Sequence, residues 1–306
     1  MSRTGTKPPP LAPDAVVEVV APSSCFDREP FDRGMEILRD AGLAVRAGEA
    51  VFARQGYLAG EDSDRAAALM QAWETPDAGA LVCARGGFGS LRLLPLLDLE
   101  RLARAPRLFA GFSDATALLA LLTARLGISA IHAPVVTHLG LMDPAVARDA
   151  AHSLAGLLAG RPAFPLAADP SRTLFPGTAQ GRVLGGNLTT LCHLAGTPFA
   201  PDFSGAILFL EDFGEAPYRL DRMLTHLGLS GMLDGVAGVA LGSFTQCGDE
   251  AEVLRVLTER LVPLSIPVAA GFPAGHGPVN LPFPLGVFAR LDANAGVLEF
   301  LEPLTA

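Results

Sequence analysis

Lysine is almost absent from this 306-residue chain, because Lys7 is the only one and every other basic residue is arginine. Lys7 also lies in a proline-rich N-terminal stretch, where we expect no accurately placed catalytic group. Schiff-base chemistry, a Ser-Lys dyad and a P-loop each need a lysine in the site. The sequence therefore excludes these three kinds of chemistry.

Cysteine and histidine are sparse and show no metal-ligand spacing. The four cysteines are widely separated, with no CxxC pair, and the six histidines form no HExxH motif. Scattered thiols in a chain of this length favour reduced core residues over a disulfide framework or a zinc site. We therefore expect neither a metal nor a cofactor.

Long hydrophobic runs are also missing. The first run, Val16–Ala21, contains Glu18 and is too short for the roughly 7 to 15 apolar residues of a signal peptide. The run Ala115–Ala124 is interrupted by threonines and stopped by Arg125, well short of the roughly 20 residues that cross a membrane. We therefore expect a cytoplasmic protein that does not associate with membranes.

Positive charge is in deficit, since 23 basic and 32 acidic residues give a formal net charge of −9. Proteins that bind nucleic acid normally present a basic stripe that displaces counterions from phosphates. The acidic balance therefore argues against a nucleic-acid partner. Half of the residues are hydrophobic, which is enough for a sizeable core in one large domain or two medium ones.

Strand-like and helix-like stretches alternate through the first half of the chain, with short apolar strands at 16–21, 80–84 and 108–112 and helical patterns that include Leu91–Leu97. This alternation predicts a mostly parallel sheet with helices on both faces. Between about Leu157 and Gly177 the periodicity fails and prolines cluster. We predict an α/β domain over 1–156, a linker over 157–177 and a smaller mixed α/β domain over 178–306.

The first segment that could carry chemistry surrounds Ser113, between an apolar strand and a helix that begins at Ala115. Gly111 and Ala115 lie two residues to either side, close to the G-x-S-x-G pattern of a nucleophile elbow. The N–H groups at the start of the helix can stabilise negative charge there. The alternative is that Ser113 only caps the helix.

The second segment, Arg85-Gly86-Gly87-Phe88-Gly89, directly follows a predicted strand. Glycines there let the backbone approach a ligand closely, and their N–H groups can hold an anion. The spacing does not fit the G-x-G-x-x-G pattern of a dinucleotide loop. A simple tight turn between strand and helix is the alternative interpretation.

The third segment combines Glu211, at the end of an apolar strand, with His276, in a loop rich in glycine and proline. A carboxylate in an apolar strand needs a partner to offset its desolvation. His132 and His193 lie in apolar segments, which favours core positions for both. The remaining three histidines, His138, His152 and His226, are predicted to lie at the surface.

Ser113, Glu211 and His276 together supply a nucleophile, an acid that orients the imidazole, and a base. The histidine would take the serine proton while the carboxylate fixes its tautomer. Because the serine precedes the predicted linker and the other two residues follow it, we expect the site in the cleft between the domains.

Several blocks of the sequence resemble the LD-carboxypeptidases, the serine peptidases of family S66, in the same order and over nearly the full chain. The blocks are VVAPSS (Val19–Ser24), YLAGEDSDR (Tyr57–Arg65), ARGGFGSLRLLP (Ala84–Pro95), FAGFSDATALL (Phe109–Leu119), GGNLTTL (Gly185–Leu191), LFLEDFGEAPYRLDRML (Leu208–Leu224) and GFPAGHGP (Gly271–Pro278).

The resemblance implies a flavodoxin-like N-terminal domain, a smaller C-terminal domain and a homodimer. It places the family's catalytic triad on Ser113, Glu211 and His276, and the oxyanion hole on the main-chain N–H groups of Gly87 and Asp114. The implied reaction is removal of the terminal D-alanine from the tetrapeptide of cytoplasmic murein fragments. Phe88 departs from the pattern, which often carries tyrosine at this position.

Substrate binding is expected at Arg85, Gly86 and Phe88, and the substrate carboxylate at Arg85 or at a cleft arginine such as Arg219 or Arg222. Two other functions stay open, and a third is disfavoured by the motifs. A microcin-immunity peptidase of the same family would cleave aminoacyl nucleotide conjugates. A two-domain binding protein would capture a small molecule without catalysis. An α/β-hydrolase esterase shares the order serine, acid, histidine but lacks the Arg-Gly-Gly block.

Overall fold

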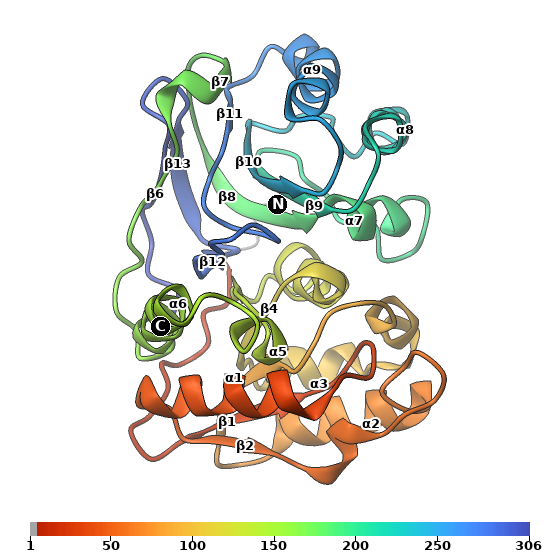
Figure 1. The fold of residues 1–306 in the computed structure, drawn as a ribbon, viewed down its shortest axis with the longest axis vertical. Helices are drawn as coiled ribbons and strands as arrows, with labels where there is room; N and C mark the ends of the chain where they lie inside the picture. The colour runs from red at the N-terminus through yellow and green to blue at the C-terminus, as the bar shows by residue number, and fades with distance from the viewer. Residues whose placement is uncertain (1–4) are drawn as a thin grey trace.

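The computed structural model describes residues 5–306, which build two β-sheets that lie one above the other in Figure 1. The N-terminal sheet has the strand order β12-β5-β4-β3-β1-β2, in which β1 to β5 are parallel. The order 2-1-3-4-5 is the flavodoxin-like one. The strands are β1 (Val16–Val20), β2 (Val45–Ala47), β3 (Ala78–Cys83), β4 (Leu108–Gly111), β5 (Ala130–His132) and β12 (Phe283–Leu285).

Helices cover both faces of this sheet. One face carries α1 (Arg28–Asp40), α5 (Val136–Leu139) and α6 (Pro144–Leu158); the other carries α2 (Asp62–Glu74), α3 (Leu99–Arg104) and α4 (Thr116–Ala120). Short turns join them: η1 (Glu49–Phe52), η2 (Ser90–Leu96), η3 (Ser113–Ala115) and η4 (Leu121–Arg125).

The central strands β3 and β4 are apolar throughout because both of their faces are buried. In β3, Ala80 and Val82 pack in the core under α1, α5 and α6, whereas Leu81 and Cys83 pack in the core under α2 and α4. Successive side chains of a strand point to opposite faces, so no position is left for a polar residue. The predicted parallel sheet with two helical layers is confirmed.

The C-terminal sheet is mixed, with the order β6-β14-β13-β8-β9-β10-β11-β7 within residues 5–306. Its strands are β6 (Leu166–Ala167), β7 (Thr173–Phe175), β8 (Thr178–Asn187), β9 (Ile207–Phe213), β10 (Gly238–Thr245), β11 (Val268–Ala270), β13 (Phe288–Asp292) and β14 (Val297–Phe300). Its helices are α7 (Leu188–Leu194), α8 (Pro217–Leu229) and α9 (Glu250–Leu261), with the turns η5 (Pro170–Arg172) and η6 (Val262–Leu264).

The two halves are joined by an apolar core as well as by the chain. One core cluster includes residues of α4 together with residues of β8, α7 and β9. At this contact the backbone of β8 comes very close to α4: a Cβ at Gly186 would lie 2.5 Å from Thr116 Oγ1. The neighbouring N–H of Asn187 donates to the same hydroxyl oxygen at 3.0 Å. This contact sets the position of one half relative to the other.

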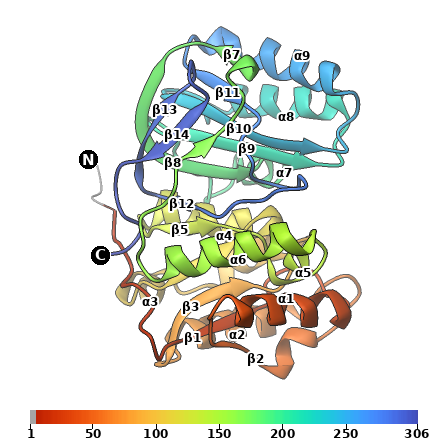
Figure 2. The same ribbon diagram turned by 60° about the vertical axis from the view of Figure 1, so that its left-hand side comes forward.

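Several elements differ in detail from the expectation. The stretch 157–177 contains β6 and β7, which pair within the C-terminal sheet, and the domain boundaries stay a prediction. Strand β12 lies in the predicted second domain but pairs with β5 of the first sheet, at the junction of the two halves in Figure 2. The unpaired edge of β5 explains this, because an edge strand offers free N–H and C=O groups.

Two predicted helices are also less regular than their patterns indicate. The expected helix at Leu91–Leu97 is the 3-10 segment η2, which contains Pro95 and so lacks one N–H donor. The expected helix from Ala115 is divided into α4 and the π-helical turn η4. Among residues 5–306, no helix is long and apolar enough to span a membrane.

Helices α1 and α5 cross with their backbones nearly in contact. A Cβ at Gly34 would lie 1.9 Å from the Val136 carbonyl oxygen, and one at Gly140 would lie 1.9 Å from the Pro30 carbonyl oxygen. We expect Gly34→Ala to lower the free energy of unfolding by about 1 to 3 kcal/mol, although alanine favours a helix. Urea unfolding measures the change.

The matched control is Gly156→Ala in α6, where the nearest atom to a new Cβ would be the Arg161 side chain at 3.6 Å. That variant should be as stable as the parent, or more stable by up to about 1 kcal/mol. Equal stability of Gly34→Ala and the parent would show that the helices can separate freely at the crossing.

Candidate active site

Ser113 lies at a sharp turn between β4 and α4. Its φ of 62° places a non-glycine residue in the left-handed region, which is strained backbone. A Cβ at Gly111 would lie 2.9 Å from the Ala115 Cβ, so both positions must be small for the turn to close. This is the geometry of a nucleophile elbow, which presents the serine oxygen at the carboxyl end of a strand.

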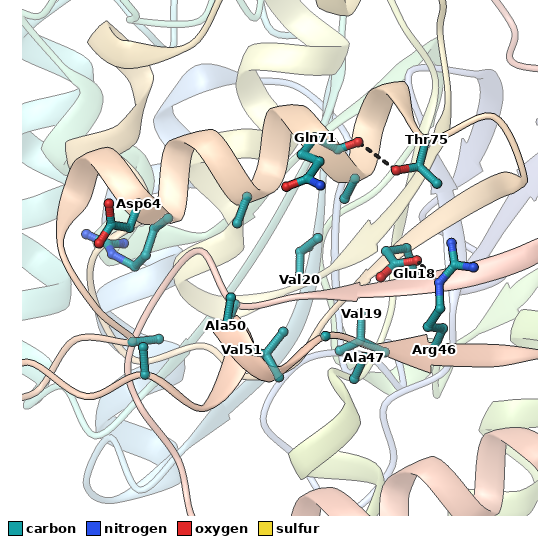
Figure 3. A pocket seen from close by; sticks show the side chains of 17 residues that line it. Glu18, Val19, Val20, Arg46, Ala47, Ala50, Val51, Asp64, Gln71 and Thr75 are labelled. Carbon is teal, nitrogen blue, oxygen red and sulfur yellow. Dashed lines mark hydrogen bonds and ion pairs between the residues drawn. The ribbon is translucent and has the colours of Figure 1, made fainter.

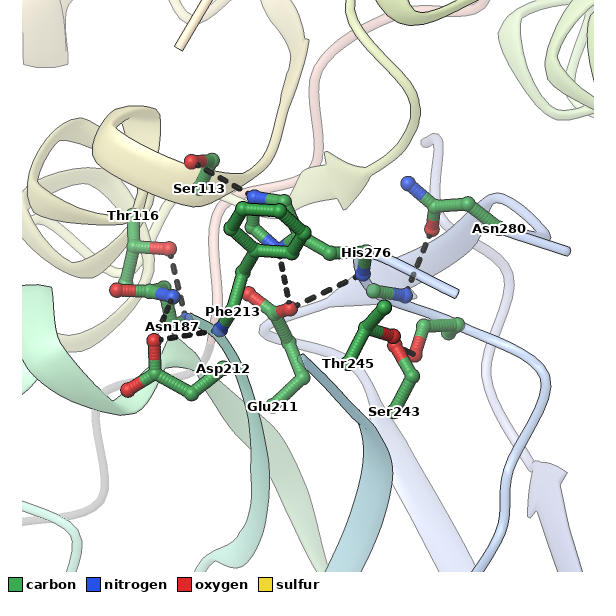
Figure 4. A network of polar contacts seen from close by, with 12 residues as sticks. Ser113, Thr116, Asn187, Glu211, Asp212, Phe213, Ser243, Thr245, His276 and Asn280 are labelled. Atoms are coloured by element: carbon green, nitrogen blue, oxygen red, sulfur yellow. Dashed lines mark hydrogen bonds and ion pairs between the residues drawn. The ribbon is translucent and has the colours of Figure 1, made fainter. Parts of the chain in front are cut away.

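The structure brings Ser113 together with His276 and Glu211 from the other half of the chain (Figure 4). His276 Nε2 lies 3.1 Å from Ser113 Oγ, and His276 Nδ1 lies 2.6 Å from Glu211 Oε2. The backbone N–H of His276 donates to the same carboxylate oxygen at 3.2 Å. With Nδ1–H donating to the carboxylate, Nε2 is left to accept the serine proton.

Glu211 is completely buried near the end of β9, and the loop before His276 is shaped to reach it. Gly275 has a φ of 108°, and a Cβ there would lie 2.7 Å from Glu211 Oε2. The N–H of Gly275 donates to Asn280 Oδ1 at 3.0 Å, and this hydrogen bond holds the loop in place. A residue other than glycine would therefore push His276 away from its carboxylate.

The charge of Glu211 acts directly on His276. Burial lowers the pKa of His276, but the hydrogen bond and charge of Glu211, with the charge of Asp212, outweigh burial and raise it. For Asp212 itself, burial and the neighbouring Glu211 raise the pKa to about 6. Four donors hold its carboxylate: Asn187 Nδ2, the Thr189 hydroxyl, the Thr189 N–H and the Phe213 N–H, at 3.0, 2.8, 2.9 and 2.8 Å.

The glycine loop after β3 packs directly on the serine. A Cβ at Gly86 would lie 2.9 Å from Ser113 Oγ and 3.6 Å from the Asp114 nitrogen, so Gly86 is buried against the nucleophile. The Phe88 N–H donates to Ser24 Oγ at 3.0 Å, which holds the loop in place. Gly87 and Asp114, whose N–H groups are the predicted oxyanion donors, line the same cavity as Ser113.

Phe112 is surrounded by three histidines, with ring centroids 4.6 Å from His276, 5.0 Å from His138 and 5.8 Å from His132. Burial lowers the pKa of both His132 and His138 to about 4, so both rings are neutral near pH 7. The expectation of a buried His132 is confirmed, but His138 is half-buried beside the site and not at the surface.

His193 was expected in the core and is exposed, because it lies on the outer side of the short helix α7. It lines the active-site cavity, which has a volume of about 520 Å³. Arg85 and Phe88 line this cavity as expected, together with Ser113 and His276. The lining residues that were not predicted include four polar ones: Asn187, Thr189, Asp212 and Glu215. These four residues belong to the GGNLTTL and EDFGE segments of the sequence. The resemblance of those segments to the family could have pointed to them.

A cavity of about 640 Å³ lies elsewhere, between α2, the edge strand β2 and its neighbour β1 (Figure 3). Alanine and valine make up much of its wall, and Arg46 on its rim already binds Glu18 and Asp77. It is not lined by Ser113, Glu211 or His276. Within the described part of the chain, no group of three or more His, Cys, Asp or Glu is placed to hold a metal ion.

The fold and the site define a two-domain α/β protein with a hydrogen-bonded serine, histidine and glutamate between its halves. The chain belongs to the LD-carboxypeptidase family: residues 17–133 match the LD-carboxypeptidase N-terminal domain, and residues 180–291 match the C-terminal domain. The resemblance noted in the sequence is confirmed.

Three relatives illustrate the range of the family. The murein tetrapeptide carboxypeptidase of Pseudomonas aeruginosa is 37% identical over 92% of this chain and 94% of that protein. The solved muramoyltetrapeptide carboxypeptidase of Oxalobacter formigenes has a TM-score of 0.80 at 31% identity, over 93% of this chain and 97% of its own.

The third relative is the microcin C7 self-immunity protein MccF, whose Escherichia coli sequence is 28% identical over 92% of this chain and 91% of that protein. Its complex with aspartyl sulfamoyl adenosine has a TM-score of 0.87 at 26% identity, over 98% of this chain and 99% of its own. An active-site mutant of MccF, with a serine, an asparagine and a lysine changed to alanine, has also been solved.

The coupling between His276 and Glu211 can be measured without a substrate. We expect Glu211→Gln to lower the pKa of His276, because the causes that raise it are weakened while burial still lowers it. NMR titration of the imidazole in parent and variant measures the shift. His152, exposed on α6, is the internal control. An unchanged or higher pKa of His276 in the variant would contradict the assigned coupling.

Proposed function

We propose that this protein is a metal-independent serine LD-carboxypeptidase that removes the terminal D-alanine from murein tetrapeptides during cell-wall recycling in the cytoplasm. The observation that carries the proposal is the hydrogen-bonded chain from Ser113 through His276 to Glu211, with distances of 3.1 and 2.6 Å. The relatives named as murein tetrapeptide and muramoyltetrapeptide carboxypeptidases support the substrate class. We also propose that the protein acts as a homodimer.

In this mechanism Ser113 Oγ attacks the carbonyl carbon before the terminal D-alanine while its proton passes to His276 Nε2. The N–H groups of Gly87 and Asp114 stabilise the oxyanion of the tetrahedral intermediate. The C–N bond then breaks, and His276 returns the proton to the amine of the departing D-alanine. This leaves the shortened peptide as an ester on Ser113.

Hydrolysis of the ester uses the same groups in reverse. His276 takes a proton from water, the hydroxide adds to the ester carbonyl, and the serine oxygen leaves with the proton that His276 donates. Glu211 keeps the imidazole in the productive tautomer and stabilises its charged form in each half-reaction. Arg85 lines the cavity beside the glycine loop and is our candidate for binding the D-alanine carboxylate.

The nucleophile assignment predicts that Ser113→Ala lowers turnover by roughly 10⁶-fold, as for other triad serines. Peptide affinity should persist because the cavity is otherwise intact. D-Alanine release measures turnover, and calorimetry measures binding. Ser204→Ala, an exposed serine before β9, is the control and should behave as the parent. Full turnover by Ser113→Ala would contradict the assignment. If the parent protein binds the peptide but releases no D-alanine, the non-catalytic binding protein would be favoured instead.

A second candidate function, cleavage of aminoacyl nucleotide conjugates, is favoured by the close structural likeness to MccF. One observation weighs against it. The MccF active site includes a lysine, whereas the only lysine here, Lys7, lies in the N-terminal segment and pairs with Glu302 at 3.6 Å. The murein substrate is therefore our preferred one.

Mass spectrometry of products from a mixed panel separates the two candidates. The panel contains murein tetrapeptides and aminoacyl sulfamoyl adenosines, with Ser113→Ala as the blank for each. We expect loss of D-alanine from the tetrapeptides and intact nucleotide conjugates. The reverse pattern would replace the murein substrate by the nucleotide conjugate while leaving the Ser113 chemistry in place.

A further inference from the structure

A second cavity lies beside the active-site cavity, and the chemistry proposed above does not use it. It has a volume of about 450 Å³ and shares three lining residues with the active-site cavity: Thr189, His193 and Glu215. Its far wall is formed by α8, with Tyr218 and Arg222 among the lining residues. Because the two cavities share a wall, one extended ligand can reach from Ser113 into the second cavity.

The charges in the second cavity do not cancel. Arg219 Nη1 lies 3.3 Å from Glu215 Oε2, and Arg219 Nε donates to the Tyr218 hydroxyl at 3.2 Å, so this guanidinium is already paired. Arg222 lies over the Tyr218 ring at 5.9 Å, and no carboxylate in residues 5–306 forms an ion pair with it. One positive charge is therefore left available in a chain of net charge −9.

The active-site cavity has its own cation, Arg85, whose guanidinium donates to the Cys25 carbonyl and has no carboxylate partner in the described chain. Two separate arginines thus face the two cavities, one beside the glycine loop and one on α8. A planar guanidinium without a carboxylate partner matches the geometry of a carboxylate. This arrangement fits a ligand with two acidic groups at two positions along its length.

We propose that Arg222 binds a second carboxylate of the substrate, upstream of the bond that is cut. The proposal rests on the proposed function, because the terminal carboxylate of the peptide is assigned to Arg85. A murein tetrapeptide carries such a group in one of two places. One is the α-carboxylate of its γ-linked glutamate, and the other is the side-chain carboxylate of a diaminopimelate in the third position.

The test compares KM and kcat of the parent and Arg222→Gln on tetrapeptides that differ in these groups. One peptide carries both carboxylates, a second has the glutamate amidated, a third has lysine in the third position, and a fourth lacks both carboxylates. For the first peptide we expect Arg222→Gln to raise KM by about 10- to 100-fold, the usual effect of losing a hydrogen bond to a charged group. The kcat should change little, because the contact is the same in ground and transition states.

The modified peptides identify the carboxylate. The peptide that lacks the bound group should already show the higher KM with the parent enzyme, and Arg222→Gln should add nothing further. Arg222→Lys should recover part of the affinity, since it keeps the charge but not the planar fork. The matched control is Arg148→Gln, an exposed arginine of α6 that lines neither cavity and should leave KM unchanged on every peptide.

Two results would overturn the subsite: an unchanged KM for the first peptide in Arg222→Gln, or an equal rise on all four peptides. The proposed function is tested separately, because it fails if the parent releases no D-alanine from any of them. In that case calorimetry tests the subsite by comparing peptide binding to Ser113→Ala with binding to the double variant that also carries Arg222→Gln. Weaker binding of the first peptide on adding Arg222→Gln supports it, and equal or undetectable binding in both variants overturns it.

Discussion

The contact between α4 and the carboxyl end of β8 is the constraint on which the active site depends. Ser113 begins the turn that leads into α4, while His276 and Glu211 belong to the other half of the molecule. Thr116 accepts a hydrogen bond from the Asn187 N–H, and Gly186 leaves no room between the two backbones. Because a continuous apolar core lies around this contact, the 3.1 Å distance between Ser113 Oγ and His276 Nε2 is set by packing and not by a flexible hinge.

The end of β9 carries two adjacent buried carboxylates, and the structure compensates each of them differently. Glu211 receives two hydrogen bonds from His276, one from the ring and one from the backbone. Asp212 is held by neutral donors that include the Asn187 side chain. A buried charge without such partners would cost several kcal/mol. The GGNLTTL block therefore serves both the domain contact and the electrostatics of the site.

Chemistry and cavity size point to different places in this molecule. The cavity beside α2 is larger than the one at Ser113, but its arginine is already neutralised by two carboxylates. At the Ser113 site, a strained serine, a histidine of raised pKa and glycine-lined backbone converge. Function is therefore located by the arrangement of reactive groups and not by the volume of a cavity.

The sequence alone determined the parallel sheet of the first half, the elbow around Ser113 and the family, because apolar periodicity and the small neighbours of the serine are local properties of the chain. It also singled out Glu211 and His276, since a carboxylate in an apolar strand needs a partner. Only the tertiary structure decided the pairing of β12 with β5, the places of His138 and His193, and the lining of the cavities by Asp212 and Glu215. These depend on contacts between residues far apart in the chain, and no short-range pattern of residues encodes such contacts.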